Sequence, residues 1–277
     1  MATDADTGAA QSPPTPAGWD TKPAAVKVGP LTMDYRTWKM LGYCGLIFMA
    51  TFIVFWGILA GNIPPFSPNA DPMQVKQHYL DHALSIEIGM SVCLTVTSFY
   101  MAWGCAISQV MRRIEGQNSF LSNLEMMGAT ITAAPIMTAC AIWLTAAHEV
   151  SNLSPETMHM LYWFGWLLID LAYMVTSFQI AAISIVFMRD KREKPLVPSW
   201  VCWWGWVTFA SFFPVSLIPF VTTGPFAFNG SFNFWIAFFT WFIWCPSLSY
   251  YVIKAVDRLK AEDAAAESGF GQPVTTH

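Results

Sequence analysis

The stretch KMLGYCGLIFMATFIVFWGILA, residues 39–60, has no charged side chain after Lys39 and is apolar almost throughout. A transmembrane helix needs roughly 20 predominantly apolar residues, because each residue advances the helix by about 1.5 Å. This stretch therefore predicts a helix that crosses a bilayer. The alternative, a membrane β-barrel, would show strands of about ten residues that alternate in polarity, and this continuous run does not.

Five further stretches have the same character, which predicts an all-α, polytopic membrane helix bundle of about six transmembrane helices. The composition agrees, because hydrophobic residues make up 55% of the chain and charged residues only 12%. A soluble domain carries about a quarter charged residues. With no basic stripe, the chain is not expected to bind nucleic acid. The predicted spans are residues 39–60, 84–108, 124–146, 161–187, 200–221 and 231–253.

The sequence divides into three predicted regions. Residues 1–37 are expected to form a disordered cytoplasmic tail, because the first 30 residues are rich in Pro, Asp and small side chains and cannot bury a core. Residues 38–260 form the predicted six-helix membrane domain. Residues 261–277 form a second predicted cytoplasmic tail.

The distribution of basic residues predicts the orientation. Of 14 Lys and Arg side chains, 13 precede the first predicted span, follow the last, or lie between spans two and three or four and five. Lys76 alone falls on the other side. Because connections rich in Lys and Arg stay in the cytoplasm, both termini are predicted to be cytoplasmic.

Acidic residues within predicted spans are candidates for function, because charge in a bilayer is costly. Asp170 lies about 13 Å into its span at helical rise. Glu87 lies near the outer end of the second span. Polar residues follow the helical period on three spans, which predicts a bundle interior or an outward-opening cavity. A packing role, with both acids protonated or paired, remains the alternative. The predicted ligand-cavity residues are Glu87, Glu149, Trp166, Asp170, Tyr173 and Ser177.

A second candidate site consists of histidines on the predicted outer side. His78 and His82 are four residues apart and share a helix face. Together with His148 they form a possible transition-metal or haem site, since imidazole and carboxylate are suitable ligands. Two histidines one turn apart do not complete a coordination shell, so interfacial histidines or a pH sensor are alternatives.

Four short motifs lie mainly in the connections: Asp71-Pro72 with His78-Tyr79, MRRIEG at residues 111–116, KPLVP at 194–198 and TGPFAFNG at 223–230. In these motifs the chain resembles a broad family of uncharacterised bacterial, mainly actinobacterial, multi-pass membrane proteins. The resemblance implies a multi-pass fold and a bacterial cytoplasmic (inner) membrane. It implies no catalytic residue.

Three functions are consistent with these patterns. The first is binding or moving a small hydrophobic compound, which kinked aromatic-rich helices with membrane acids favour. The second is a membrane enzyme acting on an apolar substrate, with a metal or haem held by outer-side His and Glu. The third is a structural or accessory subunit, assembled with copies of itself or with partner membrane subunits. Fold alone does not choose among them.

Overall fold

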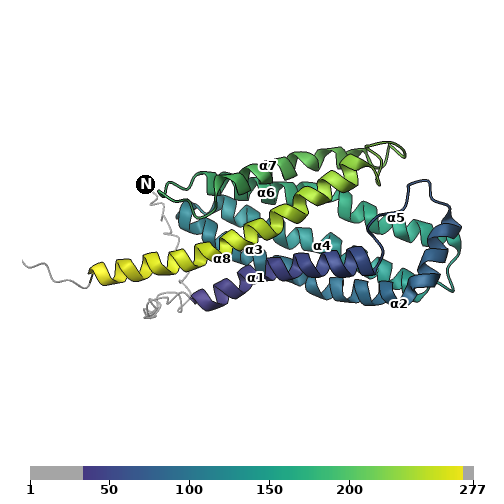
Figure 1. Ribbon diagram of the computed structural model, residues 1–277, viewed down its shortest axis with the longest axis horizontal. Helices are drawn as coiled ribbons and strands as arrows, with labels where there is room; N and C mark the ends of the chain where they lie inside the picture. Colours follow the sequence, from purple (N-terminus) through teal and green to yellow (C-terminus); the bar gives the residue numbers. More distant parts are fainter. Residues whose placement is uncertain (1–33, 271–277) are drawn as a thin grey trace, which may run out of the picture. The chain divides into compact units, whose positions relative to one another are not determined.

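The computed structural model describes residues 34–270, and side chains as far as Ser268. Every regular element in this range is helical, which confirms the all-α prediction. The predicted tails at 1–33 and 271–277 lie outside the described residues. In chain order the elements are α1 (Tyr35–Thr51), the π-helix η1 (Phe52–Leu59), α2 (Pro72–Val96), α3 (Ser98–Glu115), α4 (Phe120–His148), α5 (Pro155–Leu171), α6 (Tyr173–Met188), α7 (Ser199–Ser211), the 3₁₀ helix η2 (Phe213–Leu217), the π-helix η3 (Ser231–Ile236) and α8 (Ala237–Phe270) (Figure 1).

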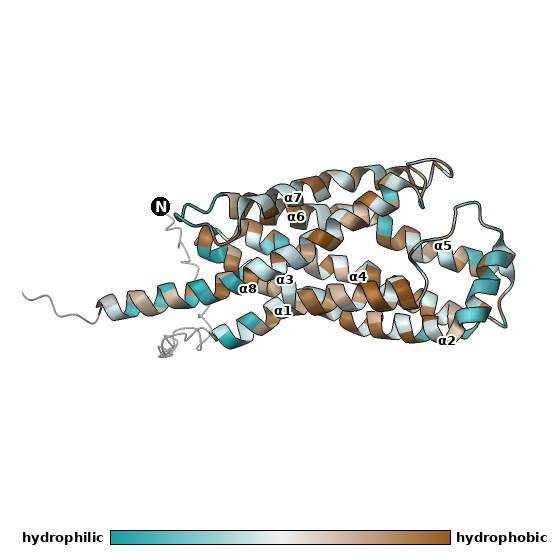
Figure 2. Ribbon diagram, in the orientation of Figure 1, coloured by the Kyte–Doolittle hydropathy of each residue, from teal (hydrophilic) through white to brown (hydrophobic). Residues whose placement is uncertain are grey.

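Within residues 34–270, five helical runs are long and apolar enough to cross a membrane. They contain five of the six predicted spans and are compatible with an integral membrane protein. Hydrophobic residues occupy the middle of the helices, and hydrophilic residues gather toward the two ends of the bundle (Figure 2). The five runs are Tyr35–Leu59, Pro72–Glu115, Phe120–His148, Pro155–Met188 and Ser231–Ser268.

The sixth predicted span, residues 200–221, contains a shorter α-helix. α7 has 13 residues and ends at Ser211, and Pro214 then lies in η2. Proline has no backbone N–H and clashes with the preceding turn, which favours the end of the α-helix before Pro214. α7 is nevertheless part of the bundle. The indole Nε1 of Trp204 donates to the Thr240 carbonyl oxygen of α8 at 2.9 Å.

The pairs Asp71-Pro72 and Ser154-Pro155 each join a capping residue to a proline, a pattern that predicts a helix start, and both predictions are confirmed. The Asp71 carboxylate caps α2 by accepting a hydrogen bond from the Met73 backbone N–H at 2.9 Å. Ser154 caps α5 and accepts from the Thr157 N–H at 3.2 Å. A proline follows each cap at the first helical position, where the missing N–H costs no helical hydrogen bond. α2 then kinks at His82 (φ −125, ψ 18), so its first turns form a separate segment before the apolar span.

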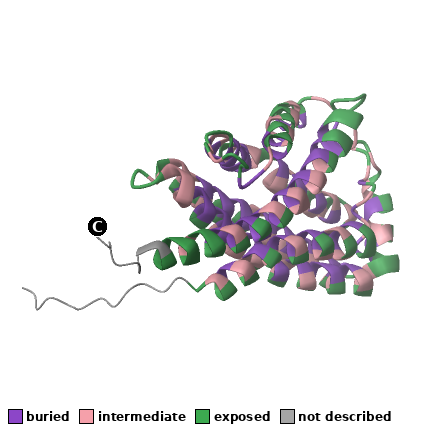
Figure 3. Ribbon diagram, turned by 60° about the vertical axis from the view of Figure 1, so that its left-hand side comes forward, coloured by how far each residue is buried: buried purple, intermediate pink, exposed green. Residues whose placement is uncertain are grey.

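Close helix contacts hold the bundle together. α4 packs against α2, α3, α5 and α6, while α1 packs against α3 and α8, and α7 against α6 and α8. Gly104 allows α3 to approach α4, because a Cβ at this position would lie 2.3 Å from the Ala129 Cβ. Small residues promote such contacts between helices in membranes. Buried residues face the neighbouring helices and exposed residues lie on the outer faces (Figure 3).

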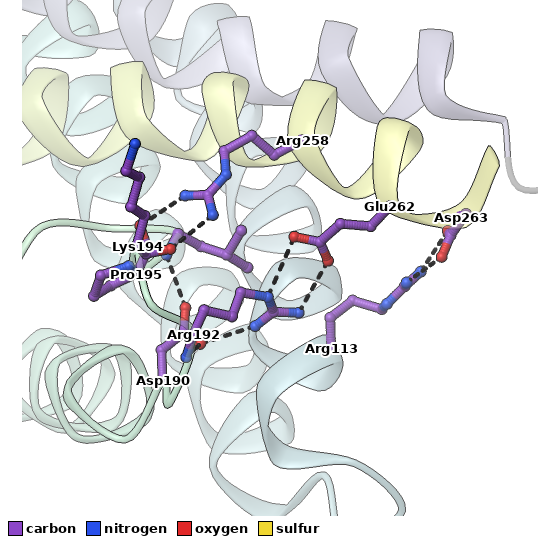
Figure 4. Close-up of polar contacts among 9 residues, drawn as sticks. Arg113, Asp190, Arg192, Lys194, Pro195, Arg258, Glu262 and Asp263 are labelled. Atoms are coloured by element: carbon purple, nitrogen blue, oxygen red, sulfur yellow. Dashed lines mark hydrogen bonds and ion pairs between the residues drawn. The ribbon is translucent and has the colours of Figure 1, made fainter. Parts of the chain in front are cut away.

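Charged side chains concentrate at the end of the bundle that we call the basic end: the start of α1, the α3–α4 and α6–α7 connections, and the last turns of α8. Arg113 pairs with Asp263 at 2.8 Å, and Arg192 pairs with Glu262 at 3.4 Å (Figure 4). Arg258 donates to two backbone carbonyl groups of the α6–α7 connection at 2.7 and 2.8 Å. These contacts hold α8 against the bundle as far as Asp263, three residues past the predicted domain end at residue 260.

Asp190 organises the α6–α7 connection at this end. Its carboxylate accepts hydrogen bonds from the Leu196 backbone N–H at 2.7 Å and from the Arg192 guanidinium at 2.9 Å. Burial raises the pKa of Asp190, but the hydrogen bonds from Leu196 and Arg192 together outweigh it and leave the pKa below its ordinary value. The ionised carboxylate therefore stabilises this connection.

Candidate functional site

A small, partly open cavity of about 70 Å³ lies between helices of the bundle. Its wall is mostly apolar and unusually aromatic, and four of its residues carry non-aromatic polar side chains. Such an apolar hollow with a few polar groups is the usual form of a small-molecule site. The lining residues are Phe52, Thr132, Pro135, Ile136, Ile169, Asp170, Ala172, Tyr173, Thr176, Phe212, Val215, Asn233, Ala237, Phe238 and Trp241.

Irregularities of five helical segments meet at this cavity. Phe52 is the first residue of η1, and Pro135 interrupts the hydrogen bonding of α4. Ala172 separates α5 from α6, and Phe212 separates α7 from η2. Ala237 is the residue at which η3 passes into α8. Non-helical backbone at membrane depth is tolerated where it is buried in protein or lines a cavity, and π-helical turns frequently mark functional sites.

Asp170 is the acidic residue of the cavity. It lies in the last turn of α5, directly before the break at Ala172, and only 8% of its surface is exposed. Among the described side chains and backbone groups, none donates a hydrogen bond to its carboxyl group. An ionised carboxyl group at this depth would be costly without a partner, so Asp170 is a candidate for contact with a ligand.

The other polar residues of the cavity differ in whether they are satisfied. The Thr132 and Thr176 hydroxyl groups bond to each other at 2.9 Å, and the Tyr173 hydroxyl bonds to Ser216 at 2.6 Å. Asn233 uses its amide nitrogen to donate to a backbone carbonyl group. Its buried Oδ1 atom has no partner among the described residues. Asp170 and Asn233, which both line this cavity, thus each have a polar group without a partner among the described residues.

Trp166 and Ser177, which the sequence grouped with Asp170, are buried beside this site but do not line it. Trp166 is fully buried and contacts Trp56 and Trp143, with ring centroids 5.3 and 5.2 Å apart. Ser177 is also fully buried, and its hydroxyl has no partner in the described part of the chain. Of the predicted set, Asp170 and Tyr173 line the cavity.

Glu87 and Glu149 belong to a different hollow. They line an open groove between α2 and α4 on the surface of the bundle. The Glu87 carboxylate lies 3.3 Å from Nδ1 of His148, whose side chain is 74% exposed. The remaining hydroxyl groups on this face, such as Ser91 and Thr145, are exposed as well. The expected single cavity containing Glu87 and Asp170 is therefore divided into two separate features.

The three histidines of the predicted metal site are not gathered. The His78 and His82 rings stack with centroids 4.7 Å apart, while His148 contacts Glu87. Over residues 34–268, no three His, Cys, Asp or Glu side chains lie close enough to hold a metal ion.

Sequence reasoning missed Glu125. This residue is completely buried between α3, α4 and α6, where its carboxyl group accepts a hydrogen bond from Gln179 Nε2 at 3.3 Å. The Tyr100 hydroxyl in turn donates to Gln179 Oε1 at 2.9 Å. The available signal was its position one turn before Gly128 and Ala129, because small residues mark the face of α4 that contacts other helices.

Comparison of the chain with family models, with curated proteins and with solved structures finds no match.

Proposed function

We propose that the chain crosses a bacterial inner membrane six times with both termini in the cytoplasm. The sixth crossing would consist of α7 followed by η2. At about 1.5 Å per α-helical residue and 2.0 Å per 3₁₀ residue, the two elements together reach roughly 30 Å, the thickness of a bilayer's hydrocarbon core. The basic end supports the orientation, because it collects Lys and Arg at the end where the described chain starts and finishes.

We further propose that the cavity beside Asp170 binds a small hydrophobic compound, and that the protein holds or moves this compound within the membrane. The observation that carries the proposal is the meeting of helix irregularities with an unpartnered carboxyl group at one apolar cavity. Broken helices at membrane depth form the binding sites of many transporters, because their ends supply unpaired backbone groups.

The experiment compares Asp170→Asn with Asp170→Leu in protein purified in mild detergent. The readout is the rise in the thermal unfolding midpoint caused by a panel of small apolar compounds, since a ligand stabilises the folded state it binds. If the cavity is a binding site that uses the carboxyl group, Asp170→Asn should abolish the rise caused by compounds that pair with this group, while its unliganded midpoint stays close to the parent's.

A packing role for Asp170 gives the opposite pattern. Asp170→Asn would then behave like the parent in every assay, and Asp170→Leu would lower the midpoint. The absence of a described hydrogen-bond partner for Asp170 argues against this role. A panel in which no compound raises the parent's midpoint would refute the binding proposal.

A role as a subunit of a larger membrane assembly is the second candidate, and the outer face of α2, α3 and α4 favours it. This face exposes hydroxyl side chains, whereas η3 and α8 expose large side chains such as Trp235 and Phe239. Small and hydroxyl residues are typical of helix contacts in membranes. The mass of the protein in mild detergent tests this candidate, because a monomer without any co-purifying partner would contradict it. The exposed residues are Ser91, Thr95, Ser98, Thr130, Thr138 and Thr145.

A further inference from the structure

The polar atoms that the cavity leaves open are mostly hydrogen-bond acceptors. The Asp170 carboxyl group and Asn233 Oδ1 have no donor among the described residues, whereas Thr132, Thr176 and Tyr173 are already paired. When it is paired with a cation, the carboxyl group is ionised and, like an amide oxygen, accepts hydrogen bonds and does not donate them. The missing partner should therefore bring several donors rather than several acceptors.

The wall of the cavity has the composition expected around an organic cation. Five aromatic residues line it and none of its lining residues is Lys or Arg. Aromatic faces attract cations within about 6 Å of the ring, and an alkyl-substituted cation also gains from apolar contact. A carboxylate enclosed by such rings lacks an internal counter-charge. The five aromatic residues are Phe52, Tyr173, Phe212, Phe238 and Trp241.

We propose that this cavity binds a small alkylammonium ion, whose N–H groups donate to Asp170 and Asn233 and whose alkyl groups contact the aromatic wall. The inference rests on the function proposed above and specifies the class of compound. A primary ammonium group has three donors and no acceptor, which matches the open atoms of the site.

The volume of the cavity limits the ion. At about 70 Å³ the cavity is roughly half the size of a 150 Å³ protein cavity that accepts benzene. Ions of about four heavy atoms, such as isopropylammonium, are therefore suitable probes. A neutral alcohol of the same shape is the closest competitor, because its hydroxyl could accept from Trp241 Nε1, a buried donor without a described partner, and donate to one oxygen.

The experiment titrates the purified full chain with isopropylammonium chloride, with isopropanol and with NaCl, at constant ionic strength and pH 7. Binding is followed by calorimetry and by the thermal unfolding midpoint. We expect isopropylammonium to half-saturate the protein at a concentration at least tenfold lower than isopropanol, and NaCl to have no effect. This comparison uses the unaltered protein, so it does not depend on whether a variant folds.

Two variants locate the effect. Asp170→Asn should weaken isopropylammonium binding at least tenfold and leave isopropanol binding unchanged, because it removes the charge and keeps the shape. Glu156→Gln is the matched control, since Glu156 is an exposed acid at the other end of the same helix and its loss should change neither titration.

Each other outcome overturns the inference in a distinguishable way. Isopropanol binding as tightly as isopropylammonium would identify a site for neutral compounds, and the proposed function would stand without the cation. Stabilisation by NaCl alone would identify a sodium site instead. If neither organic probe binds but another compound of the panel does, the alkylammonium inference fails by itself. If no compound binds, the binding function fails with it.

Discussion

Three acidic side chains within the apolar helices have three different surroundings. Asp170 faces the cavity without a partner, and Glu87 contacts His148 in an open groove. Glu125 is buried completely and contacts Gln179. The free-energy cost of an acidic side chain in a membrane helix is thus reduced in three ways. Asp170 would pair with the proposed ligand, Glu87 pairs with an imidazole, and Glu125 pairs with a side-chain amide.

The Glu125 contact gives a prediction about stability. Glu125→Ala should lower the thermal unfolding midpoint, because it leaves the buried Gln179 amide without an acceptor, at a cost of about 1–3 kcal/mol. Glu125→Gln should stay closer to the parent, because its amide oxygen can still accept the bond. Thermal unfolding of the two variants in one detergent checks this, with Glu156→Ala as the exposed control. Equal midpoints for the Ala and Gln variants would show that the contact contributes nothing.

At the scale of elements, the important feature is the position at which each helix is interrupted. π-helical turns, an internal proline and two breaks bring the irregular positions of five segments to one cavity. At the basic end, by contrast, α8 is regular and is held by ion pairs to neighbouring connections. The middle of the bundle therefore contains the features that a ligand site needs, while the end contains those that hold helices together.

The Asp190 contacts predict how the α6–α7 connection responds to acid. Because the pKa of Asp190 in the folded state lies below its ordinary value of about 3.9, its stabilising contribution is complete above that pH and is lost as the pH falls through the folded-state pKa. Compared with Asp190→Asn, the parent should be more stable at pH 7, and the difference should shrink below about pH 4.

Thermal unfolding of the parent and the Asp190→Asn variant across pH 3–7 checks this prediction. Taking the difference between the two proteins cancels the other groups that titrate in the same range. A difference that stays constant down to pH 3 would show that Asp190 does not titrate with folding.

At the scale of the whole bundle, charge separates the two ends. Lys39 pairs with Asp257 and Arg113 with Asp263 at the basic end. Lys76 lies at the opposite end, where its ammonium group donates to the Leu153 carbonyl oxygen at 2.6 Å. The three-dimensional arrangement thus preserves the asymmetry on which the proposed orientation depends.

Cysteine labelling tests that orientation. A cysteine introduced at Lys191 or near Lys22 should react only with reagent applied from the cytoplasmic side. A cysteine at Asn69 or Asn152, both exposed at the opposite end, should react from outside. The parent protein, with its six native cysteines, supplies the background. Labelling at Lys191 from outside would reverse the proposed topology.

The sequence by itself determined the features that depend on neighbouring residues. The length and hydropathy of the apolar runs predicted the five membrane-compatible helices. Asp71-Pro72 and Ser154-Pro155 predicted two helix starts. Both kinds of prediction succeed because caps and apolar runs act within a few residues. The polar stripes were also visible, since helical spacing shows which residues share a face.

Only the tertiary structure decided what each face meets. Helical spacing cannot tell whether Ser91 and Thr145 turn toward another helix of the same chain or away from it, because hydroxyl side chains bond to their own helix in either case. For the same reason Glu87 and Asp170 looked equivalent in sequence. Packing placed Glu87 in a surface groove and Asp170 at an internal cavity, which forms because interruptions far apart in the chain lie side by side.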